Sequence, residues 1–574
     1  MNLATVPLLQ TARVVTRYCL PQATSDLPHV TLQLDALLDT FSADWTIITA
    51  YKRTQSLRCV QYVAARELPE TQDPFYKRWL LNRTAELAAS RGDLPTLQWL
   101  MEIYLPVQPV DNVVEVAAAF GHLNVLQWLY EHHLERVHFG GAEICGALER
   151  KHEHVATWLL EHVPPADEYH EKVLCSAAKG GNWNVMEWLC TEFIFKASHV
   201  LQSVIDGCNW ELARWIIERY NVTGAEVNMK LPAKHGELAF LKYLFSRKMN
   251  PVAVMLLQHT DTSKSSNGWL VGKEIPPPIA DAALNGHLDV VQWIFAQNLW
   301  TRGCVDRAMD NAALGGHLDI VKWLHESGEG SCSEKAMDGA AENGHFEVVK
   351  WLHEHREEGC TVDAMDGAAK NGHLEVVKWL SEHRSEGCST SAMDYAAQNG
   401  HLDVIQWLHV NRSEGCTHYA MDGAAENGHL DIVKWLHENT SEGRPSSAMA
   451  AAVQHGHLNI VKWLYGYRCA TGAIIAMNFA VGFGHLDIVK WLHKTCEWLC
   501  STANSSAMTS AIRCGYFDVL LFLHLHSKMK FDLPFGRTAK LPTELQQWML
   551  ANYADKVHSW QFEAHKIELE TLWH

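Results

Sequence analysis

The sequence predicts an all-α solenoid, a stack of helical hairpins in which each unit packs against its neighbours. One motif repeats along the chain with a constant period, because Trp351, Trp379, Trp407, Trp435, Trp463 and Trp491 follow one another at intervals of 28 residues. Within the motif, apolar residues recur with the spacing of a helix rather than the alternation of a strand. A single hairpin cannot bury its own apolar faces, whereas a stack of hairpins can.

The motif is nearly constant in the second half of the chain and eroded in the first half. NGHFEVVKWLHEH begins at Asn343, NGHLEVVKWLSEH at Asn371 and NGHLDIVKWLHEN at Asn427. Weaker copies, such as GHLNVLQWLYEH from Gly121, extend the array toward the N-terminus. Counting the tryptophan, or the residue that replaces it, predicts 15 to 16 units with anchors from position 62 to position 522.

The first helix of a unit is predicted over a segment such as AMDGAAEN, which ends at Asn343. A serine or threonine precedes this helix and suits its N-cap in four units, at Ser333, Thr361, Ser389 and Thr417. The paired alanines 340 and 341 allow close contact between helices. Gly344 is predicted to end the helix in the left-handed conformation.

The second helix follows the Gly-His turn. Its apolar residues at 348, 349 and 352 form one stripe, which predicts a single buried face.

These features together resemble the ankyrin repeat, through the paired alanines, the Gly-His turn and the apolar stripe of the second helix. The resemblance covers about residues 82–530 and implies a right-handed ankyrin-like solenoid. The chain departs from the family in its opening, Ala-Met-Asp at 336–338, and in its period, since the usual ankyrin repeat has 33 residues. The missing residues fall in the loop 355–363, so the β-hairpin fingers of the family are expected to be reduced or absent.

Breaks in the pattern predict five segments. Residues 1–50 form a helical cap or, through Leu27 to Trp45, a segment that faintly resembles an F-box. Residues 51–257 are divergent repeats, and residues 280–530 are regular ones. A polar and proline-rich insertion at 258–279 separates them, and residues 531–574 form a C-terminal cap and tail, with a helix around Leu545 to Tyr553.

Composition argues against several classes of function. The chain has 574 residues and a net charge of −18, whereas nucleic-acid binding needs a cationic face. The most apolar stretch, from Ala470 to Gly484, is too short to cross a membrane, and the N-terminus lacks the pattern of a signal peptide. We therefore expect a cytoplasmic or nuclear monomer with no nucleic-acid or membrane partner, whose 15 cysteines stay reduced.

No enzyme motif is complete in this sequence. GWLVGKE, from Gly268, lacks one spacer residue and the Ser or Thr of a phosphate-binding loop, and the sequence contains no G-x-S-x-G or H-E-x-x-H. Four cysteines one repeat apart are too distant for disulfides and are predicted to pack as small apolar residues: Cys332, Cys360, Cys388 and Cys416. The sequence predicts a non-catalytic protein with no cofactor and no metal site.

Histidines and tryptophans repeat with the units, and packing is the simpler interpretation of both. Nine histidines follow a glycine, at 122, 287, 317, 345, 373, 401, 429, 457 and 485. Ligands one repeat apart cannot share one zinc ion, so these residues are predicted to hold the turn. A second series, at 325, 353, 409, 437 and 493, is predicted to be half exposed and without function. The tryptophans are predicted to pack between units, although a continuous aromatic surface for a partner is the alternative.

Positions that vary between units map to the exposed side of the first helix and are the candidate partner-binding residues. They are Lys335, Glu342, Asp363, Lys370, Tyr395, Gln398, Tyr419 and Glu426. Tyr395 and Tyr419 are the candidate anchors, because tyrosine is enriched at binding hot spots. The alternative is that these positions are ordinary variable surface.

The sequence therefore predicts a scaffold that holds a protein partner on the face of its first helices. The alternative is a substrate-receptor subunit of a ubiquitin ligase, which would dock onto the ligase through Leu27 to Trp45.

Overall fold

A computed structural model of the chain describes residues 45–66, 73–192, 195–222, 229–247, 278–297, 302–328, 330–466, 470–495, 505–526 and 541–557. Every regular element in these ranges is helical and none is a strand, which confirms the predicted all-α fold. The segment from Leu27 to residue 44 and the predicted insertion up to residue 277 lie outside the described residues, whereas Pro278 and Ile279 already belong to a helix. The chain divides into two compact units, Met1–Asn209 with Met508–His574 (unit 1) and Trp210–Ala507 (unit 2).

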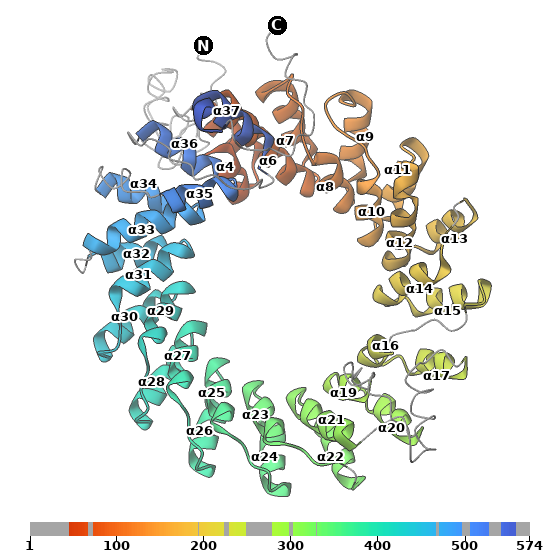
Figure 1. Cartoon of the computed structure of the whole chain (residues 1–574), viewed down its shortest axis with the longest axis vertical. Helices are drawn as coiled ribbons and strands as arrows, with labels where there is room; N and C mark the ends of the chain where they lie inside the picture. Colours follow the sequence, from red (N-terminus) through yellow and green to blue (C-terminus); the bar gives the residue numbers. More distant parts are fainter. Residues whose placement is uncertain are drawn as a thin grey trace, which may run out of the picture. The chain divides into compact units, whose positions relative to one another are not determined.

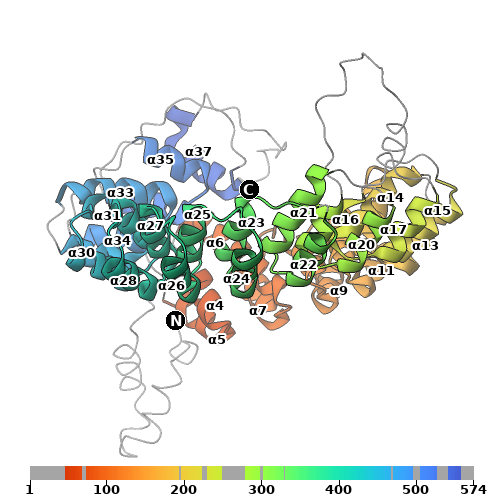
Figure 2. The ribbon, with the colours of Figure 1, turned by 90° about the horizontal axis from the view of Figure 1, so that it is seen from below.

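Unit 2 is a stack of helical pairs in two layers (Figure 1), seen from another side in Figure 2. The first helices of the pairs lie on the inner side of the curve that this unit follows, and the second helices lie on its outer side. The first helices are α16 (Lys230–Lys234), α19 (Pro278–Leu284), α21 (Arg302–Leu314), α23 (Glu334–Glu342), α25 (Val362–Lys370), α27 (Thr390–Asn399), α29 (His418–Glu426), α31 (Pro445–Gln454) and α33 (Ala470–Phe483). The second helices are α15 (Trp210–Arg219), α17 (Leu238–Ser246), α20 (Leu288–Ala296), α22 (Leu318–Glu326), α24 (Phe346–His355), α26 (Leu374–His383), α28 (Leu402–Asn411), α30 (Leu430–Asn439), α32 (Leu458–Tyr465) and α34 (Leu486–Thr495).

The two layers differ in the size of the side chains that face the neighbouring pair. Ala340 and Ala341 of α23 are fully buried, and a Cβ atom added to Gly367 of α25 would lie 2.8 Å from Cβ of Glu342. Consecutive first helices are therefore in close contact, whereas consecutive second helices, which carry the tryptophans, contact each other little. The closer spacing of the first helices accounts for the curvature of the unit toward that layer.

The turn between the two helices of a pair is held by the glycine and the histidine. Gly344 has a φ of +74°, the left-handed conformation that glycine adopts without strain. The His373 ring of the next pair lies against it, so that a Cβ atom added to Gly344 would be 2.5 Å from Cε1 of His373. The equivalent ring of His457 donates from Nε2 to the carbonyl of Glu426 at 2.8 Å. These contacts confirm the predicted structural role of the histidines that follow glycine.

The tryptophans pack between units through their edges. The second histidine series supplies the partners, because His353 lies edge-to-face against Trp379 with ring centroids 5.2 Å apart, and His409 does the same to Trp435. In other pairs Tyr465 takes the place of the histidine. The tryptophans are thus packing residues, and the second histidine series has a role in packing that the sequence did not reveal.

The half-buried histidines of the turns predict that unit 2 loses stability in mild acid. Burial lowers the pKa of His345 and of His373 below the ordinary value of 6.5. Below pH of about 6.5 the unfolded chain binds protons on these imidazoles that the folded chain does not, so stability falls as the pH drops further. Asp338 and Asp366 act in the opposite sense and at lower pH, because burial raises their pKa above 3.8.

A histidine-to-asparagine variant tests this expectation without removing the hydrogen bond. Asn209 already stands at the equivalent turn in unit 1, where its Nδ2 donates to the carbonyl of Lys179 at 2.9 Å. Between pH of about 7.5 and about 5.5, the double variant H345N/H373N should lose less unfolding free energy than the unaltered protein in urea denaturation. The matched control is H355N/H383N, whose histidines are exposed; an equal protection by this control would contradict the assignment.

Unit 1 continues the paired arrangement in the N-terminal part of the chain. Its helices are α4 (Ile47–Thr54), α5 (Leu57–Ala64), α6 (Pro74–Ser90), α7 (Leu94–Trp99), a π-helical turn (Leu100–Tyr104), α8 (Val113–Ala119), α9 (Leu123–His132), α10 (Ala142–Glu149), α11 (Glu153–His162), a 3₁₀ turn (Asp167–Tyr169), α12 (His170–Gly180), α13 (Trp183–Glu192) and α14 (Ala197–Asp206). It also holds α36 (Phe517–His526) and α37 (Thr543–Val557), while α35 (Ser505–Arg513) spans the boundary at residue 507.

The predicted C-terminal helix exists as α37, and it packs against α6. Glu544 of α37 is almost fully buried; it accepts a hydrogen bond from Nδ2 of Asn82 at 2.5 Å, and Nε of Arg78 lies 3.7 Å from the same carboxylate oxygen. Burial raises the pKa of Glu544. Phe517 of α36 fills the space between Trp548 of α37 and α6. The C-terminal helix therefore belongs to the same packed unit as the first repeats.

Candidate protein-binding face

The first helices of unit 2 are placed by hydrogen bonds that run from one pair to the next. Ser333, Thr361, Ser389 and Thr417 occupy the N-cap positions, as predicted, and each accepts from a backbone N–H two residues later. Each of these N-caps is also bonded to an aspartate of the preceding first helix. The backbone N–H of Thr361 donates to Oδ1 of Asp338 at 2.8 Å, and its hydroxyl donates to Oδ2 at 2.9 Å.

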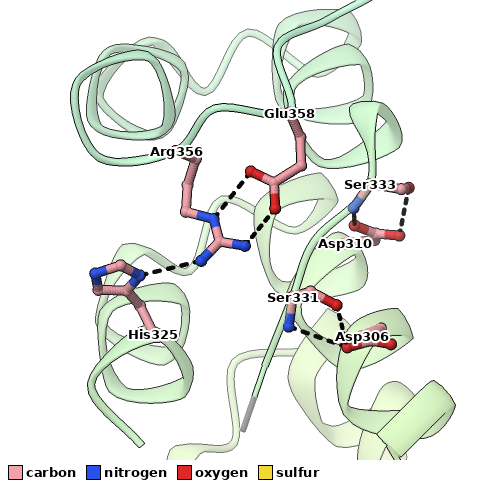
Figure 3. A network of polar contacts seen from close by, with 7 residues as sticks. All are labelled: Asp306, Asp310, His325, Ser331, Ser333, Arg356 and Glu358. Atoms are coloured by element: carbon pink, nitrogen blue, oxygen red, sulfur yellow. Dashed lines mark hydrogen bonds and ion pairs between the residues drawn. The ribbon is translucent and has the colours of Figure 1, made fainter. Parts of the chain in front are cut away.

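The bond from the hydroxyl recurs along the stack. The aspartates are Asp310, Asp338, Asp366, Asp394 and Asp422, and their partners are Ser333, Thr361, Ser389, Thr417 and Ser447. Figure 3 shows the bond between Asp310 and Ser333 beside a second one between Asp306 and Ser331. The aspartate of the Ala-Met-Asp opening thus links neighbouring pairs. This role was not predicted from the sequence. The signal was present, since a serine or threonine follows each of the first four aspartates by 23 residues.

The loops between pairs are short and closed by ion pairs. Arg356 bonds both Glu358 and His325 (Figure 3), and Arg412 bonds Glu414 in the same way. The hydrogen bond from Arg412 lowers the pKa of Glu414. The loops 356–361, 384–389 and 412–417 contain no strand, so the predicted loss of the β-hairpin fingers holds for these loops.

Three of the repeat-spaced cysteines, Cys360, Cys388 and Cys416, lie in these loops as free thiols. Burial raises the pKa of Cys360 and of Cys388 to about 11, which leaves them protonated and unreactive at neutral pH. Their predicted role in packing fits this environment.

The candidate partner-binding residues lie on the first helices α23, α25, α27 and α29, and their exposure differs. Four of them are exposed: Lys335, Asp363, Tyr395 and Tyr419. The other four are half-buried: Glu342, Lys370, Gln398 and Glu426. Among these, Nζ of Lys370 lies 3.0 Å from a carboxylate oxygen of Glu342, so one candidate pair is joined across neighbouring helices.

In three other units the register of Tyr395 is held by a glycine: Gly339, Gly367 and Gly423. A Cβ atom added to Gly423 would lie 2.9 Å from Cβ of Gln398, and Gly339 is covered by Leu314 in the same way. This register is therefore a contact between pairs rather than free surface. Tyr395 differs from these glycines, with 44% of its surface exposed.

Four apolar residues of α33 were not among the predicted partner-binding residues. Ile474, Ile475 and Phe483 are exposed, and the ring of Phe479 stacks on Phe483 at 6.0 Å. Aligning Ala476-Met477 with Ala336-Met337 places Ile475 at the register of Lys335 and Phe479 at that of Gly339. The sequence carries this alignment too, although the apolar stretch from Ala470 to Gly484 had suggested only a comparison with a membrane span.

Metal sites and membrane-spanning helices are both absent from the described part of the chain. No group of three or more His, Cys, Asp or Glu side chains there is arranged to hold a metal ion. Among the described helices, none combines the length and apolarity that crossing a bilayer requires.

Comparison with known families identifies the repeats. The family model described as ankyrin repeats (three copies) matches residues 279–366, 340–422, 393–473, 418–492 and 448–533. A search of curated proteins found no match to the chain.

Proposed function

We propose, from the ankyrin repeats that residues 279–533 form, that this protein is a non-catalytic scaffold that binds a protein partner on the first-helix face of unit 2. Ankyrin repeats generally mediate protein–protein interactions. The observation that carries the proposal is the exposure of two tyrosine side chains on this face. Tyr419 is 65% exposed and Tyr395 is 44% exposed, on neighbouring helices.

These tyrosines are not needed to build the stack. The register of Tyr419 holds Lys335 and Asp363 in other units, and the register of Tyr395 holds glycine in three other units. A rigid amphipathic ring exposed on a fixed scaffold offers contact area with little loss of side-chain entropy on binding. The outer layer supports the choice of face, because its tryptophans are engaged in packing between units.

Photo-crosslinking tests which face binds. A photoreactive phenylalanine analogue at position 395 or 419 of the full chain should yield a discrete adduct with one protein in a cell lysate. The control position is Val410 on α28, which is 79% exposed on the outer layer. Adducts from position 410 alone, or equally from all three positions, would contradict binding on the first-helix face.

The ubiquitin-ligase alternative remains a prediction. It depends on the segment from Leu27 to Trp45, and only Trp45 of this segment belongs to the described residues. We place the scaffold in the cytoplasm or the nucleus, as the sequence predicts, and leave the identity of the partner to the crosslinking experiment.

A further inference from the structure

We propose that the first-helix face of unit 2 binds an extended segment of the partner that is apolar at one end and basic at the other. The inference rests on the proposed function and adds the chemistry of the partner. It follows from the way that apolar and acidic side chains are separated along the helices α23 to α33.

The apolar end of the face lies on α29 and α33. Tyr419 and Ile475 occupy the same register two pairs apart, because each precedes an Ala-Met step. Ile475 is 46% exposed and Phe483 is 40% exposed. Exposed apolar side chains that gather in one patch are typical of interaction sites.

Small side chains on α31 separate the apolar residues of α29 from those of α33. On α31, between α29 and α33, the equivalent positions hold Ser447 and Ala451, and Ala450 replaces the aspartate of other units. All three are half-buried. Tyr419 and Ile475 thus stand on either side of a helix without large side chains at these registers. At about 10 Å per helix, α29 and α33 are about 20 Å apart, a distance that one peptide can bridge.

The acidic end of the face lies on α23 and α25. The carboxylates of Glu334, Glu342 and Asp363 lie there with the two lysines Lys335 and Lys370, whereas Asp338 and Asp366 are bonded to Thr361 and Ser389 of the next pair and do not count toward this surface. Lys370 is already paired with Glu342, and Glu334 and Asp363 are exposed. By contrast, α33 carries no charged residue from Ala470 to Phe483. Charge complementarity therefore selects Lys or Arg opposite α23 and α25 and apolar side chains opposite α33.

The length of the segment follows from the spacing of the helices. From α23 to α33 the stack advances by five pairs, or about 50 Å at about 10 Å per pair. An extended peptide covers this distance with about 15 residues at about 3.3 Å each.

Synthetic probes test the chemistry on the full-length protein by fluorescence anisotropy. The first probe is a labelled peptide of about 15 residues with Leu and Phe in one half and Lys in the other. The second has Glu in place of Lys, and the third has Ser in place of Leu and Phe. We expect the first probe to bind and each of the other two to bind at least about tenfold more weakly. Equal binding of the Lys and Glu probes, or no binding of the first, would overturn the inference.

Variants of the protein test where the apolar half and the basic half of the first probe bind. I475S/F483S should weaken the first probe at least about tenfold, whereas V410S, on the outer layer, should not. E334Q/E342Q/D363N should weaken it and reduce its salt dependence. The matched control E347Q/E375Q/D403N removes three exposed carboxylates from α24, α26 and α28 instead. An equal effect of the control variants would show non-specific attraction to an acidic protein and overturn the inference.

The outcomes also separate this inference from the proposed function. Crosslinked adducts at 395 and 419 without binding of the first probe would reject the partner chemistry alone. The absence of both would reject the binding face as well.

Discussion

Replacing Gly344 with alanine is expected to lower the free energy of unfolding by about 3 kcal/mol. A side chain in the left-handed conformation costs about 1–2 kcal/mol, and Gly344 has a φ of +74°. The added Cβ atom would lie 2.5 Å from the His373 ring, which must then move out of its packed position. Forcing extra atoms into a packed site costs about 1–3 kcal/mol more. Urea denaturation followed by tryptophan fluorescence measures the loss.

The chain offers a control for the backbone contribution alone. Gly415 has a φ of +70° and nothing within 4 Å of an added Cβ atom. G415A should therefore lose only about 1–2 kcal/mol. If the clash with the ring is real, H373A should be less destabilising in the G344A background than in the unaltered protein. Equal losses of unfolding free energy for G344A and G415A would show that the His373 ring moves aside without a cost in stability.

Removing the carboxylate of Asp366 is expected to have the second-largest effect, a loss of about 2–3 kcal/mol in D366A. The aspartate is 7% exposed and accepts from both the backbone N–H and the hydroxyl of Ser389 in the next pair. Its loss leaves two donors without an acceptor, and an unsatisfied buried donor costs about 1–3 kcal/mol. The loss of stability should be concentrated where the pair of α25 meets the pair of α27, so hydrogen exchange should increase in these two helices.

Two further variants define the mechanism. D363A removes an exposed carboxylate from the same helix and should change stability by no more than about 0.5 kcal/mol. S389A keeps the backbone donor and its acceptor, so its loss should be smaller than that of D366A. If D366A is no more destabilising than D363A, the bond between pairs does not contribute to stability.

Variants of the scaffold and variants of the binding face should behave independently. Gly344 and Asp366 hold the pairs together, whereas Tyr419 and Ile475 project from a stack that other units build without them. Y419A should weaken partner binding with little change in stability. G344A should lower stability but leave the affinity of the folded protein for the partner unchanged. This separation is typical of repeat proteins, in which each pair contacts only its neighbours.

Local chemistry explains why the repeats were predictable. The N-caps at Ser333 and Thr361, the left-handed turn at Gly344 and the buried stripe at Val348, Val349 and Leu352 each depend on residues close in sequence. The physical causes of these features, helix capping and helical periodicity, act over a few residues. For the same reason the prediction of an ankyrin-like stack was confirmed for residues 279–533.

The contacts between pairs were harder to predict, because they join residues 23 to 31 positions apart through space. A comparison of units identifies Asp338 as constant but cannot say that Thr361 is its partner. It likewise marks the register of Gly339 and Gly423 as a surface, although Leu314 and Gln398 cover these glycines. Only the stacked geometry distinguishes a small residue that is free to vary from one that makes room for its neighbour.

The sequence alone therefore determined the fold class, the pairing of helices and the periodic caps and turns. The tertiary structure decided which variable positions reach the surface, where Tyr395 is exposed but its glycine equivalents are covered, and it exposed the apolar residues of α33. It also decided that α37 lies against α6, with Glu544 bonded to Asn82 although 462 residues separate them. The division has a physical reason: capping and periodicity are local, whereas exposure and long-range partners depend on how the pairs stack.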